Sequence, residues 1–414
     1  MFASRLPGEL TPNRVSRAVA AARQSGITLL DLTETNPTAV GLDYPPVLLT
    51  GLSDPRGLRY EPDPRGLRGA REVIAHEQSS DRARPLDPDR IVLTASTSEG
   101  YSMLFKLLCN PGEQVLTPQP SYPLFDLLTR LDGVVSRPYR IEHHGVWSID
   151  RESVRDALTP LTRAILIVSP NNPTGSLLRA GDRDWLRQLA ADRGLAVIAD
   201  EVFADYPLAP ADDACAIDGP QIGPMGGPKP GPPYVPIRGP HPGPPYVLVF
   251  TLGGLSKSIG LPQAKLAWIC VDGPRELVAT ALERLDVIGD TYLSVSTPAQ
   301  LAVDHLIECG RAVRDAIRTR IRRNLDALTG AAGAHPSISV LAPEAGWSAV
   351  MRVPAIQPEE TLVLRLIEQQ HVLVHPGYFF DFAADAWLVV SLLPEPGIFD
   401  EAVARLLPVA AGAA

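Results

Sequence analysis

The sequence predicts an α/β protein built on a mostly parallel sheet and completed by a smaller α+β domain. Three observations support this fold class. The 414 residues exceed the roughly 250–300 at which a single core usually divides. Short apolar runs alternate with helical patterns as far as residue 271. After a long helical stretch, shorter strand and helix patterns follow to the C-terminus.

Seven apolar runs are expected to form the strands of the large sheet. Several of them are continuously apolar, which is typical of strands that are buried on both faces. Helical patterns at residues 97–109 and 183–192 would cover the two faces. The expected strands are residues 91–94, 114–117, 134–139, 164–169, 195–200, 246–252 and 265–271.

The second domain is expected after a helical region at residues 273–328, which Thr297-Pro298 interrupts. We place the large domain at residues 51–290. Residues 1–50 and 291–414 would form an N-terminal arm and the small domain, with the arm wrapped onto that domain or a partner subunit. The small domain would contain strands at 337–341, 346–353, 372–375 and 387–393, and helices at 359–370 and 399–407.

Residues 207–245 form a segment that is rich in proline and glycine, in which PGPPYV occurs twice. Proline cannot donate to a helix or an interior strand, so this segment is expected to be an extended insertion. It is either a tolerated surface insertion or a lid or partner-binding segment.

Composition narrows the possible partners. The chain has 38 basic and 47 acidic residues, a net charge of −9, which gives no general attraction to nucleic acid or anionic membranes. No apolar run approaches the roughly 20 residues of a membrane span. The four cysteines are widely separated and lack metal-ligand spacing, so we expect reduced thiols in a cytoplasmic protein without a metal site. Small molecules are therefore the expected partners.

Lys257 is the first candidate catalytic residue. It lies in TLGGLSKSIGLPQAK, after an expected strand and among small residues. A partly desolvated amine in this setting loses its proton more readily and attacks carbonyl groups. Taken alone, the segment is equally compatible with a surface lysine that follows a turn.

Three other segments carry polar groups at expected strand ends. SPNNPTG contains Asn172, and an apolar strand ends at Asp200, so both would face the crevice at the carboxyl edge of a parallel sheet. A turn and a strand cap explain these residues equally well. Ser96 and Glu99 match a capping box, and the helix start between them could also hold a phosphate.

Together with Pro120-Ser121-Tyr122, these motifs resemble, in their order, the class I/II aminotransferases. This family belongs to the aspartate aminotransferase superfamily of fold type I and uses pyridoxal 5′-phosphate (PLP). The resemblance runs from about residue 31 to the C-terminus. It implies that Lys257 forms the Schiff base and acts as general base, that Asp200 pairs with the ring nitrogen, and that Asn172 binds the phenolic oxygen.

The resemblance also implies the remaining cofactor contacts. Tyr122 would stack on the ring, and Tyr60 would reach the phosphate in the neighbouring subunit of a twofold dimer with shared active sites. Ser96, Thr97 and Ser98 would hold the phosphate, and Lys265 would supply a positive charge to it. Ser256, the neighbour of Lys257, would be a further cofactor contact.

Four positions depart from the family pattern. Phe203 cannot supply the hydroxyl that the family usually directs at the phenolic oxygen, and Gly254 replaces a phosphate-binding serine. Lys265 stands where an arginine normally grips the phosphate, so the charge is kept without the bidentate fork. Val389 occupies the position of the arginine that clamps the substrate carboxylate.

The sequence therefore predicts an aminotransferase that moves an amino group from an amine or amino acid to a keto acid. A PLP-dependent lyase or cyclase of the same fold is the alternative. A regulatory or binding protein is disfavoured because Lys257, Asp200 and Asn172 are all present. Because of Val389, we expect common amino acids such as aspartate or alanine to be poor substrates. His143, His144 and His375 are expected to be packed or solvated.

Overall fold

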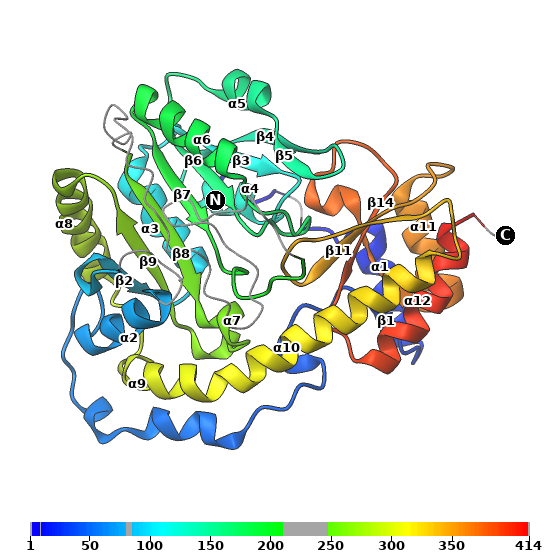
Figure 1. The fold of residues 1–414 in the computed structure, drawn as a ribbon, viewed down its shortest axis with the longest axis horizontal. Helices are drawn as coiled ribbons and strands as arrows, with labels where there is room; N and C mark the ends of the chain where they lie inside the picture. The colour runs from blue at the N-terminus through cyan, green and yellow to red at the C-terminus, as the bar shows by residue number, and fades with distance from the viewer. Residues whose placement is uncertain (1, 9, 80–84, 210–246, 413–414) are drawn as a thin grey trace, which may run out of the picture.

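The computed structural model describes residues 2–8, 10–79, 85–209 and 247–412. A large sheet and a small sheet lie side by side, and one long helix, α10, runs from the first to the second (Figure 1). The predicted combination of an α/β part and a smaller α+β part is confirmed. Among the described residues, no helix is long and apolar enough to cross a membrane.

The large sheet has eight strands in the order β2-β9-β8-β7-β6-β3-β4-β5. The neighbours from β8 to β4 are parallel, and the pairs at the two edges are antiparallel. The strands are β2 Ile91–Thr94, β3 Gln114–Gln119, β4 Val135–His143, β5 Trp147–Ile149, β6 Thr162–Val168, β7 Ala196–Asp200, β8 Val249–Gly254 and β9 Ala267–Asp272.

All seven predicted strands are present, and β5 is an additional strand. It pairs antiparallel with the end of β4 through a turn at Gly145, whose φ is 88°. Three residues are too few to show a periodic pattern, which is why the sequence did not reveal this strand. The eighth strand extends the edge of the sheet and leaves the predicted centre unchanged.

Helices cover both faces of the large sheet, as its continuously apolar strands require. One face packs against α3 Thr97–Leu108, α4 Phe125–Leu131 and α8 Arg275–Tyr292, through residues that include Leu104 and Leu282. The other face packs against α5 Arg151–Ala157 and α6 Ala180–Arg193, through Val154 and Leu186.

The predicted helical region comprises α8, α9 Thr297–Leu301 and α10 Val303–Ala332. At 30 residues, α10 is about 45 Å long. Arg318 on this helix donates to the carbonyl of Asp205 in the large part, at 2.7 Å. Six residues further on, Asn324 donates to the carbonyls of Leu392 and Pro394, both at 2.8 Å. The helix therefore contacts both parts of the molecule within less than two turns.

The small sheet has the order β10-β11-β14-β13, and all of its pairs are antiparallel. Its strands are β10 Ser339–Leu341, β11 Ser348–Arg352, β13 His375–Pro376 and β14 Trp387–Ser391. The helices α11 Glu359–Arg365 and α12 Pro396–Ala410 pack against it in one core with α10, and a π-helix at Leu366–Gln370 extends α11.

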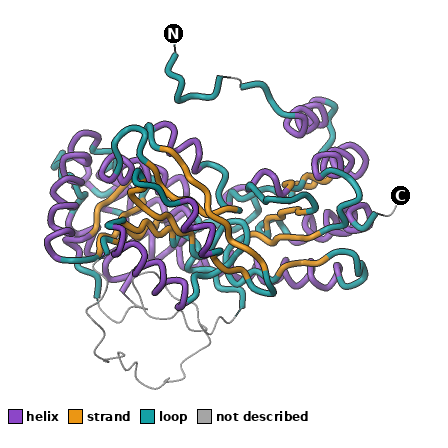
Figure 2. The backbone as a smooth tube through the Cα atoms, turned by 90° about the horizontal axis from the view of Figure 1, so that it is seen from above, coloured by secondary structure: helices purple, strands orange, loops and turns teal. Residues whose placement is uncertain are grey.

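The N-terminal arm contains a helix that the sequence did not predict, α1 Arg14–Gln24, which the side chain of Asn13 caps. Beyond it, β1 Leu30–Asp31 pairs in parallel with β12 Val372–Leu373 of the small domain. This pairing places β1 beside β12, and the division of the chain into an arm and two domains stays a prediction. In Figure 2 the described residues before α1 follow an extended path above the rest of the molecule, and Arg5 among them donates to the Leu131 carbonyl at 3.0 Å.

Short helices make up the rest of the described structure. They are α2 Arg68–Ser79, α7 Leu255–Ser258 and the 3₁₀ helices Pro37–Ala39, Pro46–Ser53, Pro55–Leu58, Pro88–Arg90, Pro262–Ala264 and Gly377–Phe380. The insertion predicted at residues 207–245 lies outside the described residues from position 210 onward, as does Cys215. Its first residue, Pro207, forms an isolated bridge with Ala345.

Candidate active site

Lys257 and Asp200 lie at the carboxyl ends of two neighbouring parallel strands. Asp200 is the last residue of β7, and its backbone is paired with Leu252 of β8. Lys257 follows β8 in the single turn of α7. This is the sheet edge at which α/β folds bind ligands, and Asp200 lies there as its place at the end of an apolar strand predicted.

Asp200 is held by two hydrogen bonds in a buried position. The Tyr101 hydroxyl donates to its Oδ2 at 2.6 Å, and the backbone N–H of Val202 donates to its Oδ1 at 3.1 Å. Burial raises the pKa of the Asp200 carboxyl, and these hydrogen bonds and the charge of Lys257 act in the opposite direction. A protonated ring nitrogen placed beside this carboxylate would satisfy its charge.

The amine of Lys257 lies between aromatic side chains. Its Nζ is 4.8 Å from the ring centre of Trp347 and 5.6 Å from that of Phe203. Burial lowers the pKa of Lys257 from 10.5 to about 8, although the charge of Asp200 opposes this shift. About a tenth of this amine is therefore neutral at pH 7, against less than about a thousandth for an ordinary lysine, and the neutral form is the one that attacks an aldehyde.

Two phenol groups fix the backbone around Lys257. The Tyr206 hydroxyl donates to the carbonyl of Lys257, and the Tyr44 hydroxyl donates to that of Gly260 at 2.7 Å. Sequence analysis did not identify these tyrosines, because they come from segments far from the lysine in the chain. Tyr101 had a detectable signal, since it lies four residues after Thr97 and therefore on the same face of α3.

The start of α3 has both features that the sequence predicted. The Glu99 N–H donates to Ser96 Oγ at 3.1 Å, and the Ala95 N–H donates to Glu99 Oε2 at 2.6 Å, which confirms the capping box. Thr97 and Ser98 are the first two residues of the helix, so their N–H groups have no acceptor within it. These groups suit a phosphate, as the resemblance implied.

A hydrogen bond joins the segments that carry Asn172 and Tyr122. Asn171 Nδ2 donates to Ser121 Oγ at 3.1 Å. Asn172 and Tyr122, the two predicted cofactor residues, come directly after Asn171 and Ser121 in the chain, so this hydrogen bond links their backbones. Tyr122 packs edge-on against Phe125, with ring centres 5.8 Å apart, and is about one third exposed.

Gly254 is the last residue of β8, and Lys265 lies near the end of the segment that joins β8 to β9. A Cβ at Gly254 would lie 2.9 Å from the Cβ of Ala267, so a serine at this position would require a shift of the neighbouring strand. This close approach accounts for the departure from the family pattern. Lys265 is exposed and has left-handed backbone angles, with φ of 51°. Ser256, the neighbour of Lys257, is half-buried.

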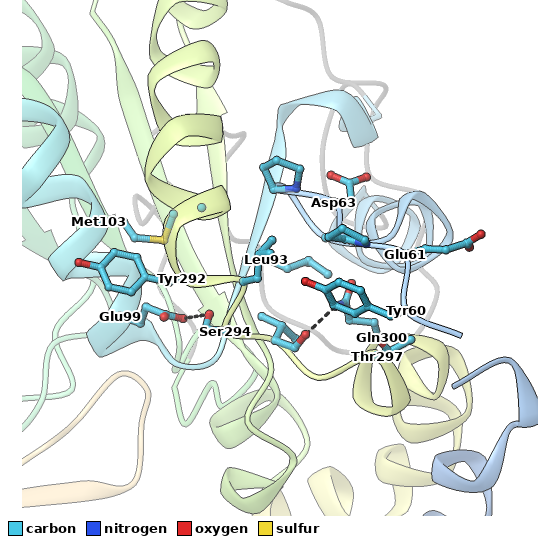
Figure 3. A pocket seen from close by; sticks show the side chains of 16 residues that line it. Tyr60, Glu61, Asp63, Leu93, Glu99, Met103, Tyr292, Ser294, Thr297 and Gln300 are labelled. Atoms are coloured by element: carbon cyan, nitrogen blue, oxygen red, sulfur yellow. Dashed lines mark hydrogen bonds between the residues drawn. The ribbon is translucent and has the colours of Figure 1, made fainter. Parts of the chain in front are cut away.

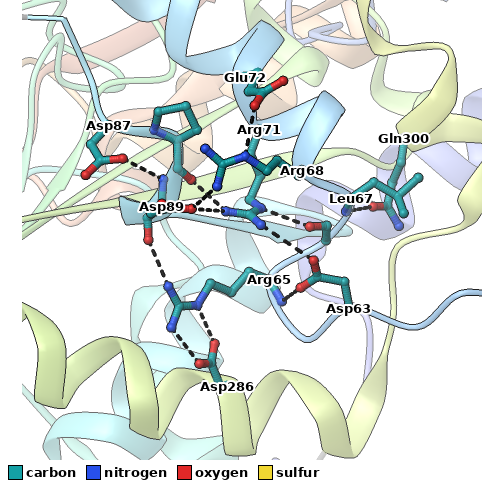
Figure 4. Close-up of polar contacts among 12 residues, drawn as sticks. Asp63, Arg65, Leu67, Arg68, Arg71, Glu72, Asp87, Asp89, Asp286 and Gln300 are labelled. Carbon is teal, nitrogen blue, oxygen red and sulfur yellow. Dashed lines mark hydrogen bonds and ion pairs between the residues drawn. The ribbon is translucent and has the colours of Figure 1, made fainter.

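Tyr60 does not belong to the group around Lys257 within one chain. It is 74% exposed and lines a surface pocket with Glu99, Tyr292 and Gln300 (Figure 3). A bidentate pair between Arg65 and Asp286, with both contacts at 2.6 Å, fixes the segment that follows Tyr60 against α8 (Figure 4). The predicted contribution of Tyr60 to a partner subunit therefore stays a prediction.

Val389 is part of an apolar wall of the small sheet. It is 1% exposed and packs with Val350 and Phe380. The Ser121 N–H donates to the Phe380 carbonyl at 3.1 Å, so this wall adjoins the segment that carries Tyr122.

His375 is paired with Val389 across β13 and β14. Its ring is stacked on that of Phe379 at 4.9 Å, as expected for a packed histidine. Burial lowers the pKa of His375 to about 4, so its imidazole is neutral at neutral pH.

The residues that the structure brings together fit a PLP molecule. A buried carboxylate suits the ring nitrogen, a lysine with a lowered pKa suits the aldehyde, and unpaired N–H groups at a helix start suit the phosphate. The indole Nε1 of Trp347 is buried without a hydrogen-bond partner among the described residues, close to the same lysine.

Comparison with known proteins agrees with this chemistry. Residues 35–406 match the family described as aminotransferase class I and II. The chain is 25% identical over 401 residues to an alanine aminotransferase of Mycobacterium tuberculosis, covering 95% of this chain and 88% of that protein. It is 24% identical over 378 residues to the glutamate-pyruvate aminotransferase AlaA of Escherichia coli, with 89% and 87% covered.

A third relative and a solved structure extend the comparison. The S-alkyl-thiohydroximate lyase SUR1 of Arabidopsis thaliana is 28% identical over 259 residues, covering 59% of this chain and 50% of that protein. An alanine aminotransferase structure from Pyrococcus furiosus superposes with a TM-score of 0.81 at 22% identity, covering 98% of both chains. The match over residues 35–406 shows that this chain belongs to the class I and II aminotransferase family.

Proposed function

We propose that this aminotransferase binds PLP covalently through Lys257 and transfers an amino group from an amine or amino acid to a keto acid. One observation carries the proposal. Lys257, whose pKa burial lowers to about 8, and the buried carboxylate of Asp200 lie at the ends of adjacent strands. The cofactor, when bound, supplies an aldehyde and a ring that accepts electrons.

Asp200 would keep the ring nitrogen protonated. Tyr101 orients the carboxylate through its 2.6 Å hydrogen bond, so that Oδ2 has a fixed position. A carboxylate buried in this way gains most by pairing with a cation, which here would be the protonated ring nitrogen.

Lys257 would have two roles at one atom. Its neutral Nζ would bond to the aldehyde carbon with loss of water, and, once a substrate amine had displaced it, the freed Nζ would be the group that takes and returns the proton on the substrate carbon. The hydrogen bonds from Tyr206 and Tyr44 to the surrounding carbonyls hold the loop in one place during both events.

The phosphate would lie at the start of α3. The N–H groups of Thr97 and Ser98 would donate to it, and Ser96 and Ser256 would add hydroxyl groups. Lys265 would supply a positive charge, and Tyr60 of a second copy would complete the site in a homodimer. Asn172 would donate to the phenolic oxygen, and Tyr122 would stack on the ring.

The substrate would be an amine, or an amino acid held without an arginine at position 389. The wall formed by Val350, Val389 and Phe380 supplies no charge to a carboxylate, and the neighbouring His375 is neutral. A buried carboxylate without a charged or densely hydrogen-bonded partner is strongly disfavoured. We therefore propose that alanine and aspartate are poor substrates, although named relatives are alanine aminotransferases.

A lyase activity is the second candidate, and the Arabidopsis relative named as a lyase favours it. A donor substrate alone separates the two activities. An aminotransferase releases one keto acid per active site and then stops, because its cofactor retains the amino group. A lyase continues to turn over without a keto acid acceptor.

Borohydride reduction followed by peptide mapping tests the proposed attachment. We expect one modified peptide, containing Lys257, from the PLP-loaded protein. A panel of amines and amino acids, added while the visible absorbance of the bound cofactor is followed, would then identify donors. A modified lysine other than Lys257, or none, would contradict the proposal.

A further inference from the structure

Trp347 carries a buried polar group that the fold leaves unused. Its side chain is 2% exposed, and its indole Nε1 has no hydrogen-bond partner among the described residues. A buried donor without an acceptor is costly, and most such groups in proteins are paired. The donor therefore needs an explanation beyond the packing of its ring.

The position of Trp347 suggests what the acceptor is. The ring centre lies 4.8 Å from Lys257 Nζ, and the ring meets Phe203 edge-on at 5.3 Å. The Trp347 carbonyl accepts from the Leu392 N–H at 2.7 Å, and the neighbouring Gly346 N–H donates to the Tyr206 carbonyl at 2.9 Å, so the backbone that carries the indole is tied to both parts of the molecule.

The covalent structure of pyridoxal places an acceptor at this point. Its aldehyde carbon and its phenolic oxygen are attached to adjacent ring carbons. When Nζ is bonded to the aldehyde carbon, this oxygen lies about 3 Å from Nζ, at ordinary hydrogen-bond range. Phe203, the other aromatic neighbour of the amine, has no donor to offer it.

We propose that the indole N–H of Trp347 donates a hydrogen bond to the phenolic oxygen of PLP bound at Lys257. This inference rests on the proposed function and adds a cofactor-positioning residue to it. The indole would provide from the small domain the hydrogen bond that Phe203 cannot provide from the large one. Asn172 would approach the same oxygen from the large domain.

The hydrogen bond has a measurable electrostatic effect. A donor stabilises the negative charge on the phenolic oxygen, and the Schiff-base nitrogen beside it then holds its proton less tightly. The pKa of the Schiff base is therefore lower with the indole N–H than without it. Spectrophotometric titration of the resting holoenzyme measures this pKa with no turnover.

Trp347→Phe is the central variant, because it removes the donor and keeps an aromatic ring. We expect the pKa of the Schiff base to rise by about one unit, the equivalent of one hydrogen bond. Trp147→Phe is the matched control. Trp147 is also a buried indole whose Nε1 has no partner in the described structure, but it lies in β5 at the sheet edge. Its replacement should leave the titration unchanged.

A second variant keeps the proposal testable if Trp347→Phe does not fold. Phe203→Tyr supplies a hydroxyl beside the same oxygen, so it should restore the titration of the Trp347→Phe protein to near its original midpoint. In the otherwise unchanged protein, the same hydroxyl should shift the midpoint far less, because the oxygen already has its donors.

Three results would overturn the inference. The first is an unchanged Schiff-base pKa in folded Trp347→Phe. If the Michaelis constant for carboxylate substrates rises in that variant at the same time, the acceptor is the substrate and not the cofactor. The second is an equal shift in the Trp147→Phe control. The third is a Phe203→Tyr variant whose midpoint falls by the full amount of one donor. If the unchanged protein shows no titrating absorbance with PLP, the proposed function itself fails.

Discussion

The large sheet and the small sheet differ in the chemical character of the residues that we propose face the cofactor and the substrate. The wall from the large sheet carries Asp200, Asn172 and the open start of α3, which are charged or hydrogen-bonding groups. The wall from the small sheet carries Val350, Val389 and Phe380 and a neutral histidine. The first wall keeps Lys257, Asp200 and Asn172 but departs from the family pattern at Phe203, Gly254 and Lys265, and the second departs from it at Val389.

This difference suggests that residues of the large sheet carry out catalysis, whereas residues of the small sheet determine substrate specificity. Electron withdrawal and proton transfer depend on Asp200 and Lys257, which an aminotransferase and a lyase of this fold would both need. Specificity depends on groups that meet the rest of the substrate, and here those groups are apolar. We expect substitutions on the first wall to change rates greatly, and those on the second to change which substrates react.

The largest effect is expected for Lys257→Ala. Removing the amine eliminates both the covalent bond and the proton carrier, so turnover should fall by about 10⁴-fold or more. Mass spectrometry after borohydride reduction should show no PLP adduct. Lys106→Ala is the control. It removes a lysine of α3 that is paired with Asp132 at the end of α4, and its turnover should stay close to that of the unchanged protein. An adduct in the Lys257→Ala protein would place the bond elsewhere.

Asp200→Asn should rank next, with a loss of about 10²–10⁴-fold in kcat, since the ring nitrogen would lose its proton. PLP should still bind, as the absorbance of the reconstituted protein would show. Tyr101→Phe removes one of the two hydrogen bonds to the carboxylate and should give a smaller loss. Near-normal kcat in Asp200→Asn would rule out the assigned role.

Val389→Arg tests the second wall. The residue is 1% exposed, so a guanidinium there would be buried among apolar side chains. We expect kcat/KM for the best amine or amino acid donor to fall about tenfold, without efficient use of alanine or aspartate. Val389→Ala controls for the change in packing. Efficient transamination of alanine by the unchanged protein, at about 10⁴ M⁻¹s⁻¹ or more, would show that the apolar wall does not select substrates.

Lys265→Ala should weaken PLP binding by about tenfold, because a phosphate would lose one nearby positive charge. Equilibrium dialysis of PLP against the variant measures the change. Lys265→Arg should bind at least as tightly as the unchanged protein, because its fork matches phosphate oxygens. Equal affinity in all three proteins would show that another group holds the phosphate.

The pH dependence of cofactor capture is the smallest expected effect. Only the neutral amine attacks the aldehyde, and burial lowers the pKa of Lys257 to about 8. The rate of PLP capture by the cofactor-free protein should therefore rise with pH and level off above about 8, well below the ordinary value for lysine. Asp200→Asn removes a charge that favours the ammonium form, so the midpoint should move to lower pH. A rate that still rises steeply above pH 9 would contradict the lowered pKa.

The fold was largely predictable from local patterns, because continuously apolar runs mark strands that helices cover on both faces. The missed elements have physical reasons. The strand β5 has three residues. The helix α1 is an exception, because Val15, Ala18, Val19 and Ala22 follow helical spacing and could have indicated it, although only Ala22 is fully buried. The pairing of β1 with β12 joins residues more than three hundred positions apart, which no local pattern encodes.

The site was predictable where single motifs define it and unpredictable where distant segments meet. Asp200 and Lys257 each follow a recognisable strand. Trp347 and Tyr206 contact the lysine from other parts of the chain, and their roles depend on packing that a linear pattern does not show. His375 resembles an ordinary packed histidine in the sequence, and only the strand register places it beside Val389.

The long helix α10 is tied to both parts of the molecule over the same stretch. Arg318 and Arg322 donate to the carbonyls of Asp205 and Pro207 in the large part, whereas Arg320 and Asn324 donate to those of Leu393 and Leu392 in the small part. Because these contacts alternate along the helix, rotation of one part against the other would strain its middle. The site has a similar link, since the Gly346 N–H donates to the Tyr206 carbonyl and the Tyr206 hydroxyl donates to that of Lys257. A movement of the small part would therefore be transmitted to the reactive lysine itself.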